Sequence, residues 1–361
     1  MQICHYLCFD ADQRISMQIY ADSLNKALSG IKELELNRFK PTSKLSRFSN
    51  NRTLMRYLRY YHYPRSVAGV DADIHHVLDH GYAHLQAKLG KGMHCVTVHD
   101  LIPLLTWRGL IESSSPIRKP ILNLHSLSYL SKFDKIITIS QSTADDLVEY
   151  LDIEPQRISV IPPVIGDHFV RSSELAMDTF RQRYRLDSKT RWLLISGREY
   201  YKNHHTSLKV LQALQQHIDV PVGLIKIGLP CSEFNQSVAQ LGLSNQVRNI
   251  YLEDPAELVD VYSMVDCLLF PSLYEGFGMP VAEALACGTP VITSNRGSLP
   301  EVVGDLAPKL DPFDVQGLSK AVKKTLLDES IKKRILSDGP NWVMQFKQQT
   351  VVPQLEKFYR A

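Results

Sequence analysis

The sequence predicts an α/β protein made of two doubly wound domains, each built on a parallel sheet with helices on both faces. In the second half of the chain, short runs that are apolar throughout alternate with amphipathic helical patterns. Wholly apolar strands of this kind belong in a parallel sheet that is buried on both faces. The length of 361 residues is enough for two domains of about 150 residues each, with some elements to spare.

The second half contains the clearest elements. Strands are predicted at residues 192–196, 222–227, 249–252, 267–270 and 290–293. The helix after the first strand has apolar residues at helical spacing, at Leu208, Leu211, Leu214 and Ile218. Further helices are predicted after Ser232, from Pro255, and from Pro280 to Gly288. Helices between parallel strands supply the crossover connections that such strands require.

The first half repeats this pattern less regularly. Its predicted strands are Ile3–Phe9, Ile74–Leu78, Cys95–His99, Lys135–Ile139 and Ile158–Ile161, and its helices include Ile19–Leu28, Asn123–Ser131 and Thr143–Leu151. Residues 166–191 are charged and show no clear apolar period, which indicates a domain boundary. We therefore expect an N-terminal domain at 1–165 and a C-terminal domain at 166–341, with a last helix at about 342–361 that packs back on the first domain. The carboxyl ends of both sheets are expected to face a cleft, because ligands of open parallel sheets bind at those ends.

The composition excludes several classes of protein. With 44% hydrophobic and 22% charged residues the chain is not disordered, and runs such as Cys267–Phe270 are far shorter than the roughly 20 residues of a membrane span. The N-terminal segment lacks the basic and apolar regions of a secretory signal. The six cysteines contain no Cys-x-x-Cys pair, which favours reduced core thiols in a cytoplasmic protein over a zinc site. A net charge of +3 is too small to indicate a nucleic-acid partner.

Residues 270–292 carry the strongest chemical signal. A buried strand is followed by a loop in which Gly276 and Gly278 enclose Phe277 and allow close approach of a ligand to the backbone. After Met279, a proline opens a helix whose first amides and positive dipole end favour a phosphate. Glu275 stands in this loop.

A second carboxylate, Glu283, follows eight residues after Glu275, in the early turns of the helix. Carboxylates beside a phosphate site are suited to accept hydrogen bonds from the hydroxyls of sugars and riboses. The pattern therefore indicates a nucleotide-linked sugar, with ribose at one carboxylate, hexose at the other and the diphosphate between them. The alternative is that Glu283 only complements the helix dipole.

A basic loop follows the first strand of the same predicted sheet. Arg198 and Lys202 leave the carboxyl end of that strand just before a helix, where two cations can neutralise a diphosphate. The alternative for this pair is an ordinary exposed basic loop.

These segments together resemble the retaining, nucleotide-sugar-dependent glycosyltransferases of family 4 (group 1), over roughly residues 190–325. The family signature of two glutamates separated by seven residues is matched by Glu275 and Glu283, and Ala286–Ile292 and Gly297–Gly304 are also family-like. The resemblance implies the GT-B fold of two Rossmann-like domains. It implies that Glu275 contacts the donor sugar, that Glu283 contacts the ribose, and that Arg198 and Lys202 hold the diphosphate. The rest of the donor site is expected in the loop that contains Gly276, Phe277, Gly278 and Met279.

The N-terminal half resembles the family more loosely. Thr97–Pro103 resembles the segment whose histidine contacts the donor sugar, which implies that role for His99. Many members carry a Gly-rich loop after the first strand, but here Asp10–Met17 contains no glycine. The acceptor side is expected to include Asp79, His80, Tyr82 and Asp100. Because the family needs no metal, we expect no metal site and no cofactor, with the nucleotide-diphosphate sugar as co-substrate.

We thus expect a retaining, metal-independent glycosyltransferase that moves a hexosyl group to an acceptor hydroxyl in surface-glycan or polysaccharide biosynthesis. Two alternatives remain open: a nucleotide-sugar epimerase of the same fold, and a non-catalytic nucleotide-sugar-binding subunit, which the missing Gly-rich loop motivates.

Residues 36–70 are unusually basic. They contain eight Lys or Arg and no Asp or Glu, interleaved with aromatic and aliphatic residues. This mixture suits an anionic membrane surface or a lipid-linked acceptor. The alternative is a solvated helix whose aromatic residues pack on the N-terminal domain. The resemblance favours peripheral contact with the inner face of a membrane.

Overall fold

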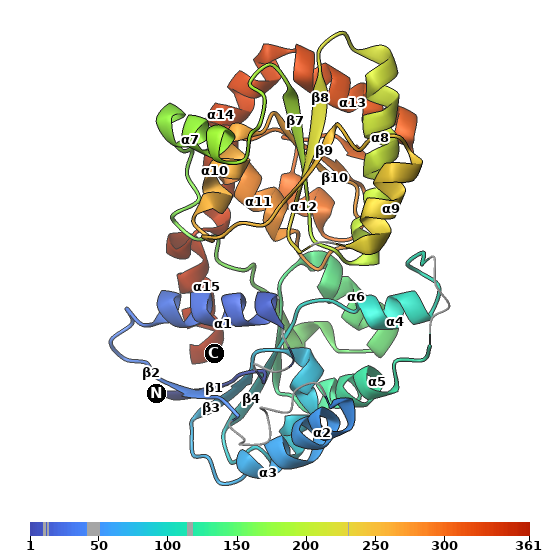
Figure 1. The fold of residues 1–361 in the computed structure, drawn as a ribbon. Coiled ribbons are helices and arrows are strands. Elements are labelled where there is room, and N and C mark those ends of the chain that lie inside the picture. Colours follow the sequence, from blue (N-terminus) through green and yellow to red (C-terminus); the bar gives the residue numbers. More distant parts are fainter. Residues whose placement is uncertain (10–11, 13, 42–50, 114–117, 230) are drawn as a thin grey trace. The chain divides into compact units, whose positions relative to one another are not determined.

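The computed structural model describes residues 1–9, 12, 14–41, 51–113, 118–229 and 231–361, and it divides the chain into two compact units (Figure 1). Unit 1 contains Met1–Leu110, Ile117–Val164 and Gln348–Ala361, and unit 2 contains Ile111–Pro116 and Ile165–Lys347. Each unit has a parallel sheet in which six strands are described. The prediction of a doubly wound α/β protein is therefore confirmed.

The sheet of unit 1 has the strand order β2-β1-β3-β4-β5-β6. Its strands are β1 (Gln2–Tyr6), β2 (Glu35–Phe39), β3 (Ile74–Val77), β4 (Met93–Val98), β5 (Lys135–Thr138) and β6 (Ile158–Val160). In the central strand β1, Ile3 pairs with Leu36 on one side and Ile74 on the other. The chain reverses its direction of travel across the sheet between β1 and β3, so this is the topological switch point where ligands bind in such sheets.

One face of this sheet is covered by the helices α1 (Ile15–Leu28) and α15 (Gln348–Arg360). Their apolar residues share a single buried cluster with residues of β1, β3 and β4. The remaining helices of unit 1 are α2 (Arg52–Tyr57), α3 (Tyr63–Ser66), α4 (Ile102–Trp107), α5 (Ile121–Leu127) and α6 (Gln141–Leu151). A π turn (Leu58–His62) joins α2 to α3, and short 3₁₀ segments lie at His80–Lys88, Leu130–Lys132 and Pro155–Arg157.

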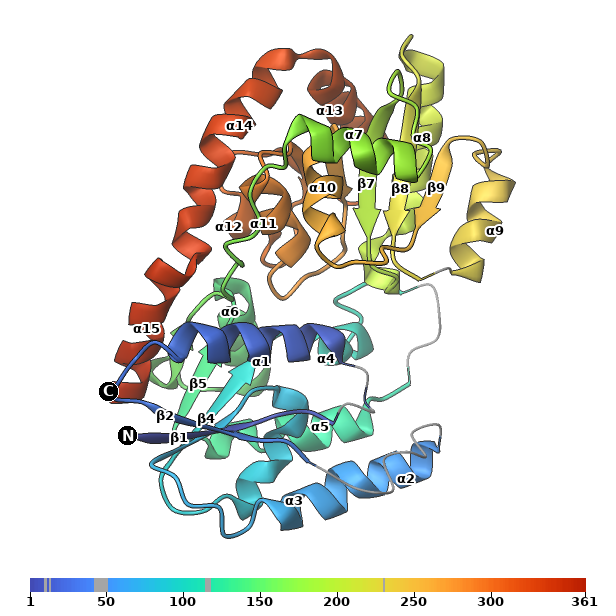
Figure 2. The same cartoon turned by 60° about the vertical axis from the view of Figure 1, so that its left-hand side comes forward.

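The sheet of unit 2 has the strand order β12-β11-β10-β7-β8-β9, and its switch point lies between β7 and β10. Its strands β7, β8 and β9 lie side by side in Figure 2. Its strands are β7 (Arg191–Ser196), β8 (Val222–Ile227), β9 (Val247–Ile250), β10 (Cys267–Phe270), β11 (Val291–Ser294) and β12 (Lys309–Leu310). Its helices are α7 (Glu174–Arg183), α8 (His204–His217), α9 (Ser232–Gln240), α10 (Glu257–Met264), α11 (Met279–Ala286), α12 (Leu299–Val303), α13 (Val315–Leu327) and α14 (Glu329–Val343). The 3₁₀ turns Tyr200–Lys202 and Met344–Phe346 complete the unit.

Strand β2 and helix α7 are among the elements that the sequence analysis missed, and both are poor in buried apolar residues. Strand β2 reads Glu-Leu-Asn-Arg-Phe and lies at the sheet edge, where no residue of the strand is fully buried. Helix α7 lies inside the stretch that showed no apolar period, and it buries only Met177 and Phe180. The strand predicted at 249–252 begins and ends two residues earlier, at Val247 and Ile250.

Three observations concern the predicted compartment and metal content. No helix in the described part of the chain has the length and apolar character needed to cross a membrane. Over the same residues, no group of three or more His, Cys, Asp or Glu side chains is placed to hold a metal ion. All six cysteines are free thiols, and all but Cys231 are buried.

A buried polar cluster fixes the C-terminal helix to the sheet of unit 1. The Tyr359 hydroxyl of α15 lies 2.7 Å from Nδ1 of His76 and 3.2 Å from Nε2 of His5. The other ring nitrogen of His76 lies 2.8 Å from the Thr97 hydroxyl. Both histidines have no solvent exposure, and burial lowers the pKa of His5 to about 3 and that of His76 well below its usual value.

These histidines predict an acid-sensitive unit 1. Because both folded-state pKa values lie below the unfolded value of about 6.5, the unfolded chain binds more protons in acid, and stability falls as the pH drops through about 6.5. His5→Phe is expected to reduce this loss, between pH 6.5 and 5, by at most about 1.4 kcal/mol per pH unit. Hydrogen exchange of the β1 and β3 amides at pH 7 and 5 measures this loss of stability for unit 1 alone. The control is His125→Gln, which changes an exposed histidine of the same unit; an equal pH effect in both variants would contradict the prediction.

Candidate active site

The switch point of unit 2 brings a cation and a carboxylate together. Lys202 follows β7, Glu275 follows β10, and the Lys202 Nζ lies 2.8 and 3.0 Å from the two Glu275 oxygens. The two side chains are only 11% and 9% exposed. The ammonium also lies 4.9 Å from the centre of the Phe270 ring. Two residues predicted from sequence to serve one site therefore contact each other at the place where such sheets bind ligands.

Asn203 fixes the lysine loop. It adopts a left-handed conformation (φ 55°) that ends the 3₁₀ turn carrying Lys202 and begins α8. Its side-chain amide donates to the carbonyls of Pro271 (3.1 Å) and Pro312 (2.8 Å). The loop after β7 is thereby tied to the loop after β10, so the lysine and the carboxylate are held at a fixed separation.

The turn at Gly297 and Ser298 holds the backbone of Glu275. The Ser298 hydroxyl lies 3.0 Å from the Glu275 carbonyl and 2.7 Å from the Phe277 carbonyl, and the Ser298 amide donates to the Glu275 carbonyl at 3.3 Å. At Gly297 φ is +54°, and a Cβ atom would lie 2.8 Å from the Glu275 carbonyl oxygen. Only glycine fits this approach without displacing the loop that carries Glu275.

The predicted glycine-containing loop leads into α11 as the sequence suggested. Gly278 has φ +98°, and a side chain there would meet Leu299 at 2.7 Å. Phe277 is buried and packs edge-on against Phe346 at 5.2 Å. Gly276 is buried, and Met279 is partly exposed at the first position of the helix. A helix start of this kind, next to a lysine, provides a site for an anion.

Glu283 lies one turn into α11 and is held by a tyrosine that the sequence analysis missed. The Tyr262 hydroxyl of α10 donates to the Glu283 carboxylate at 2.8 Å. Burial raises the pKa of Glu283 to about 7, opposed by this hydrogen bond and by the charge of Lys202. The structure thus places Glu275 and Glu283 around one lysine.

Arg198 is placed less centrally than Lys202. Its side chain is exposed on the loop after β7, and its backbone amide donates to the Glu199 carboxylate at 3.1 Å. It shares the carboxyl edge of the sheet with the Lys202–Glu275 pair.

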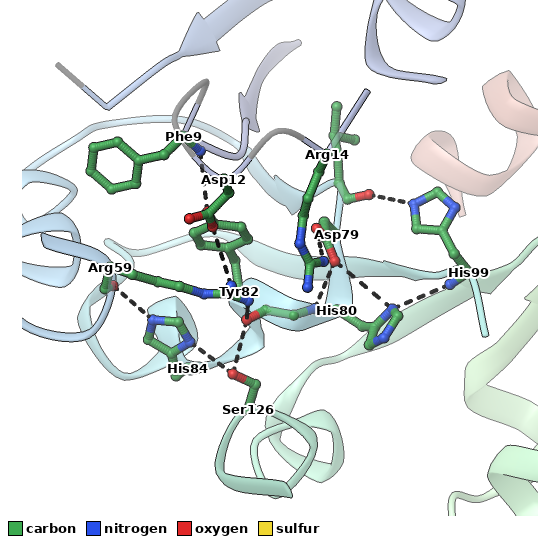
Figure 3. Close-up of polar contacts among 12 residues, drawn as sticks. Phe9, Asp12, Arg14, Arg59, Asp79, His80, Tyr82, His84, His99 and Ser126 are labelled. Atoms are coloured by element: carbon green, nitrogen blue, oxygen red, sulfur yellow. Dashed lines mark hydrogen bonds and ion pairs between the residues drawn. The ribbon is translucent and has the colours of Figure 1, made fainter. Parts of the chain in front are cut away.

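At the switch point of unit 1, ion pairs join residues that follow β1 to other parts of the unit (Figure 3). Arg14 pairs with Asp79, which follows β3. Asp12 pairs with Arg59 at 3.2 Å and accepts a hydrogen bond from the Tyr82 hydroxyl. Asp12 and Arg14 are therefore held at the carboxyl edge of this sheet by charge.

Asp79 has a structural role in unit 1, because its carboxylate pairs with Arg14. It is 2% exposed, and it also accepts a hydrogen bond from the Gly81 amide at 2.8 Å. Burial alone would raise the pKa of Asp79, but the Arg14 guanidinium, followed by the nearby His80, holds it well below its usual range. The carboxylate is therefore ionised at neutral pH and serves the loop. Asp12 and Arg14 had no predicted role, although charges in a glycine-free loop were a usable signal, and Arg59 was predicted only as one cation of the basic segment 36–70.

The hydrogen bonds of His99 define its protonated nitrogen. Its Nε2 lies 2.8 Å from the Leu78 carbonyl, which only accepts, so Nε2 carries the proton. Burial lowers the pKa of His99, so the ring is neutral and Nδ1 is an acceptor. The His99 amide donates to Nδ1 of His80 at 3.3 Å. The neighbouring Asp100 is partly buried and accepts from the Ile102 amide at 2.9 Å.

Family models match both halves of the chain. The model described as glycosyl transferases group 1 matches residues 176–342, and the model described as glycosyltransferase family 4 matches residues 15–168. The chain is 31% identical to the serotype-specific mannosyltransferase WbdA of Escherichia coli over 250 residues. This alignment covers 66% of this chain and 29% of WbdA. It is 28% identical to the O-antigen chain mannosyltransferase B of Escherichia coli, over 62% of this chain and 60% of the relative. The chain thus spans only part of these relatives.

Solved structures share the fold at low sequence identity. Sucrose-phosphate synthase from Thermosynechococcus elongatus aligns over 100% of this chain and 98% of its own, with a TM-score of 0.77 and 18% identity. Anabaena HepE, solved in complex with UDP-glucose, aligns over 100% and 99% with a TM-score of 0.72 and 16% identity. Together with the two family models, this alignment across both units means that the chain belongs to the family 4, group 1 glycosyltransferases with the GT-B fold.

Proposed function

We propose that this protein is a retaining, metal-independent hexosyltransferase that moves a sugar from a nucleotide-diphosphate donor to an acceptor hydroxyl during surface-glycan biosynthesis. The Lys202–Glu275 pair at the switch point of unit 2, with Glu283 beside it, carries the proposal. The relatives named as mannosyltransferases favour a mannosyl group. A glycan or a lipid-linked glycan is the acceptor in this proposal.

Each side chain has a role that follows from its contacts. Lys202 and the start of α11 stabilise the negative charge of the departing diphosphate, with Arg198 at the edge. Glu283 accepts hydrogen bonds from the ribose, and Glu275 does so from the donor sugar while it holds Lys202 in place. In unit 1, His99 offers Nδ1 as an acceptor to a sugar hydroxyl.

The contacts of Glu275 favour a front-face mechanism. Both of its oxygens are bonded to the Lys202 ammonium, which makes the carboxylate a weak nucleophile. The bond from the sugar carbon to the diphosphate oxygen breaks, and the acceptor oxygen forms its bond on the same face. The acceptor proton passes to the departing phosphate oxygen. Retention of configuration then needs no covalent glycosyl-enzyme intermediate.

The alternatives differ in their products. An epimerase forms a new sugar nucleotide, and a binding subunit forms no product. The glycine-free loop motivates the binding-subunit alternative, and two residues of this region, Asp12 and Arg14, form ion pairs with Arg59 and Asp79.

Turnover of GDP-mannose and UDP-hexoses, with and without glycan acceptors, tests the transferase proposal. Nucleoside diphosphate release that depends on acceptor is expected. Lys202→Ala should raise the barrier by about 2–4 kcal/mol, as when one stabilising donor is removed from developing negative charge. Glu283→Ala should weaken binding of the free nucleoside diphosphate in calorimetry, whereas Glu275→Ala should lower turnover with little effect on that binding.

The matched control is Lys209→Ala, which removes an exposed lysine of α8 in the same unit. Normal turnover of Lys202→Ala, or equal losses of nucleotide affinity in both glutamate variants, would refute this assignment of roles. A new sugar nucleotide formed without acceptor would identify an epimerase instead.

Nucleotide binding should also depend on pH through Glu283. Because its pKa lies near 7, the carboxylate becomes ionised, and a better acceptor for ribose hydroxyls, as the pH rises from 6 to 8. Tyr262→Phe removes a hydrogen bond to the ionised form, so the pKa should rise and the affinity midpoint should move to higher pH. Tyr184→Phe is the control, because it removes a similar bond to Glu257 at 2.9 Å on the surface of the same unit. Calorimetric titrations of nucleoside diphosphate that show the same midpoint in all three proteins would count against this role.

We further propose that residues 36–70 contact the anionic cytoplasmic face of a membrane. Arg56, Tyr57, Tyr61 and Arg65 are exposed on α2, the π turn and α3, and the Arg65 guanidinium lies 3.4 Å from the centre of the Tyr61 ring. Two other cations of the segment are occupied, since Arg38 pairs with Asp22 at 2.5 Å and Arg59 pairs with Asp12. Lys44, Arg47 and the side chain of Arg52 lie outside the described residues.

Sedimentation with phosphatidylglycerol vesicles tests this contact. Binding is expected at low salt and release at about 1 M salt, where the Debye length is only about 3 Å. The double variant Arg56→Glu/Arg65→Glu should lose binding, whereas Lys209→Glu/Lys320→Glu, with the same net charge and both changes at exposed sites of unit 2, should retain it. Wild-type protein that stays in solution at low salt would make the segment an ordinary solvated face.

A further inference from the structure

Unit 2 contains a groove that shares Arg198 with the proposed donor site and whose other lining residues have no role in the proposed chemistry. It has a volume of about 550 Å³ and is lined mainly by residues that follow the carboxyl ends of strands: Arg198, Glu199 and Tyr200 after β7, Glu233 and Phe234 after β8, and Phe313 after β12. Its volume falls within the roughly 300–1,000 Å³ range of small-molecule sites. The groove therefore opens at the edge of the sheet that carries the Lys202–Glu275 pair.

The groove lies on the opposite face of the sheet from the ribose carboxylate. Helices α8 and α9, whose residues line it, pack in the apolar cluster on one face. Helix α11, which carries Glu283, belongs to crossovers that run across the sheet in the other direction, and right-handed crossovers place it on the other face. A nucleoside whose ribose is bound at Glu283 consequently occupies the α11 side and leaves this groove to another ligand.

The lining of the groove suits pyranose rings. Tyr200 and Phe313 keep 45% and 48% of their surface exposed, whereas Phe234 and Leu208 are buried among the lining residues. Exposed aromatic faces pack against the apolar C–H faces of sugars, and the cost of leaving such rings in water marks a binding function. Three carboxylates of the described residues line the same groove, those of Glu112, Glu199 and Glu233, and carboxylates accept hydrogen bonds from hydroxyls.

The charge of the lining argues against an anionic ligand. Among the lining residues that the structure describes, the three carboxylates, Glu112, Glu199 and Glu233, outnumber the one arginine, Arg198. His204 adds no charge, because burial lowers its pKa to about 4 and its Nε2 is occupied by the Ser196 carbonyl at 3.1 Å. Phosphate groups are therefore repelled, and a neutral ligand rich in hydroxyls is favoured.

We propose that this groove binds the saccharide chain of the acceptor as a neutral oligosaccharide of two or three sugar units. The proposal rests on the proposed function, and it assigns recognition of the growing glycan to the α8–α9 side of unit 2. Sugars stack on Tyr200 and Phe313, and their hydroxyls bind Glu199 and Glu233. A longer acceptor thus gains affinity that a single sugar lacks.

Calorimetry and amide-shift NMR with α-linked mannotriose and methyl α-mannoside, in the absence of donor, test the proposal. The trisaccharide is expected to bind more tightly than the monosaccharide and to shift amides near Phe313 and Glu233. Phe313→Ala and Tyr200→Ala should each weaken trisaccharide binding by roughly fivefold or more, the loss expected when an aromatic anchor residue is truncated. Glu233→Gln separates hydrogen bonding from stacking and should weaken binding without removing a ring.

The matched control is Leu175→Ala, which removes a side chain that is 77% exposed on α7, outside the groove. The proposal is overturned if wild-type protein binds mannotriose no better than methyl α-mannoside, or if the groove variants bind it as wild type does. Competition between mannotriose and free nucleoside diphosphate would assign the groove to the nucleotide instead. Donor turnover is measured separately, so failure of this proposal is distinguishable from failure of the transferase function.

Discussion

The organisation of each unit depends on an ion pair that spans the switch point of its sheet. Arg14 and Asp79 join the loops after β1 and β3 in unit 1, and Lys202 and Glu275 join the loops after β7 and β10 in unit 2. A largely buried charge without a partner is strongly destabilising, often by 3–5 kcal/mol, so each pair requires its two loops to remain together. The sheet fixes where the strands end, and the ion pair fixes the loops that continue beyond them.

The two pairs have different consequences for chemistry. In unit 2 the Gly297–Ser298 turn and Asn203 hold the backbone around the pair, so the lysine is ordered before any substrate arrives. Electrostatic stabilisation by such preordered groups needs little reorganisation during reaction. In unit 1 the pair between Arg14 and Asp79 places charges beside two histidines, His80 and His99, whose pKa values are lowered by burial.

The sequence was sufficient for the fold class and for the central residues of unit 2, because strands buried on both faces and the spacing of Glu275 and Glu283 are visible in one dimension. It was insufficient for residues that act through a partner distant in the chain. Tyr262 is an ordinary helical tyrosine until α10 meets α11, and Arg59 reads as one more cation until it reaches Asp12. Edge strand β2 was missed because an exposed edge does not require an apolar pattern.

Helix α15 has a consequence for how the chain folds during synthesis. It covers the same face of the first sheet as α1, yet it lies more than 340 residues after β1 in sequence, and almost all of unit 2 is made in between. Unit 1 therefore emerges first but completes its core last, because the part of the face that receives Val351, Leu355 and Phe358 remains uncovered until α15 has been synthesised. Contacts of such long range slow folding and leave apolar surface open to aggregation. In the growing chain, unit 2 is thus the first unit that can close its own core.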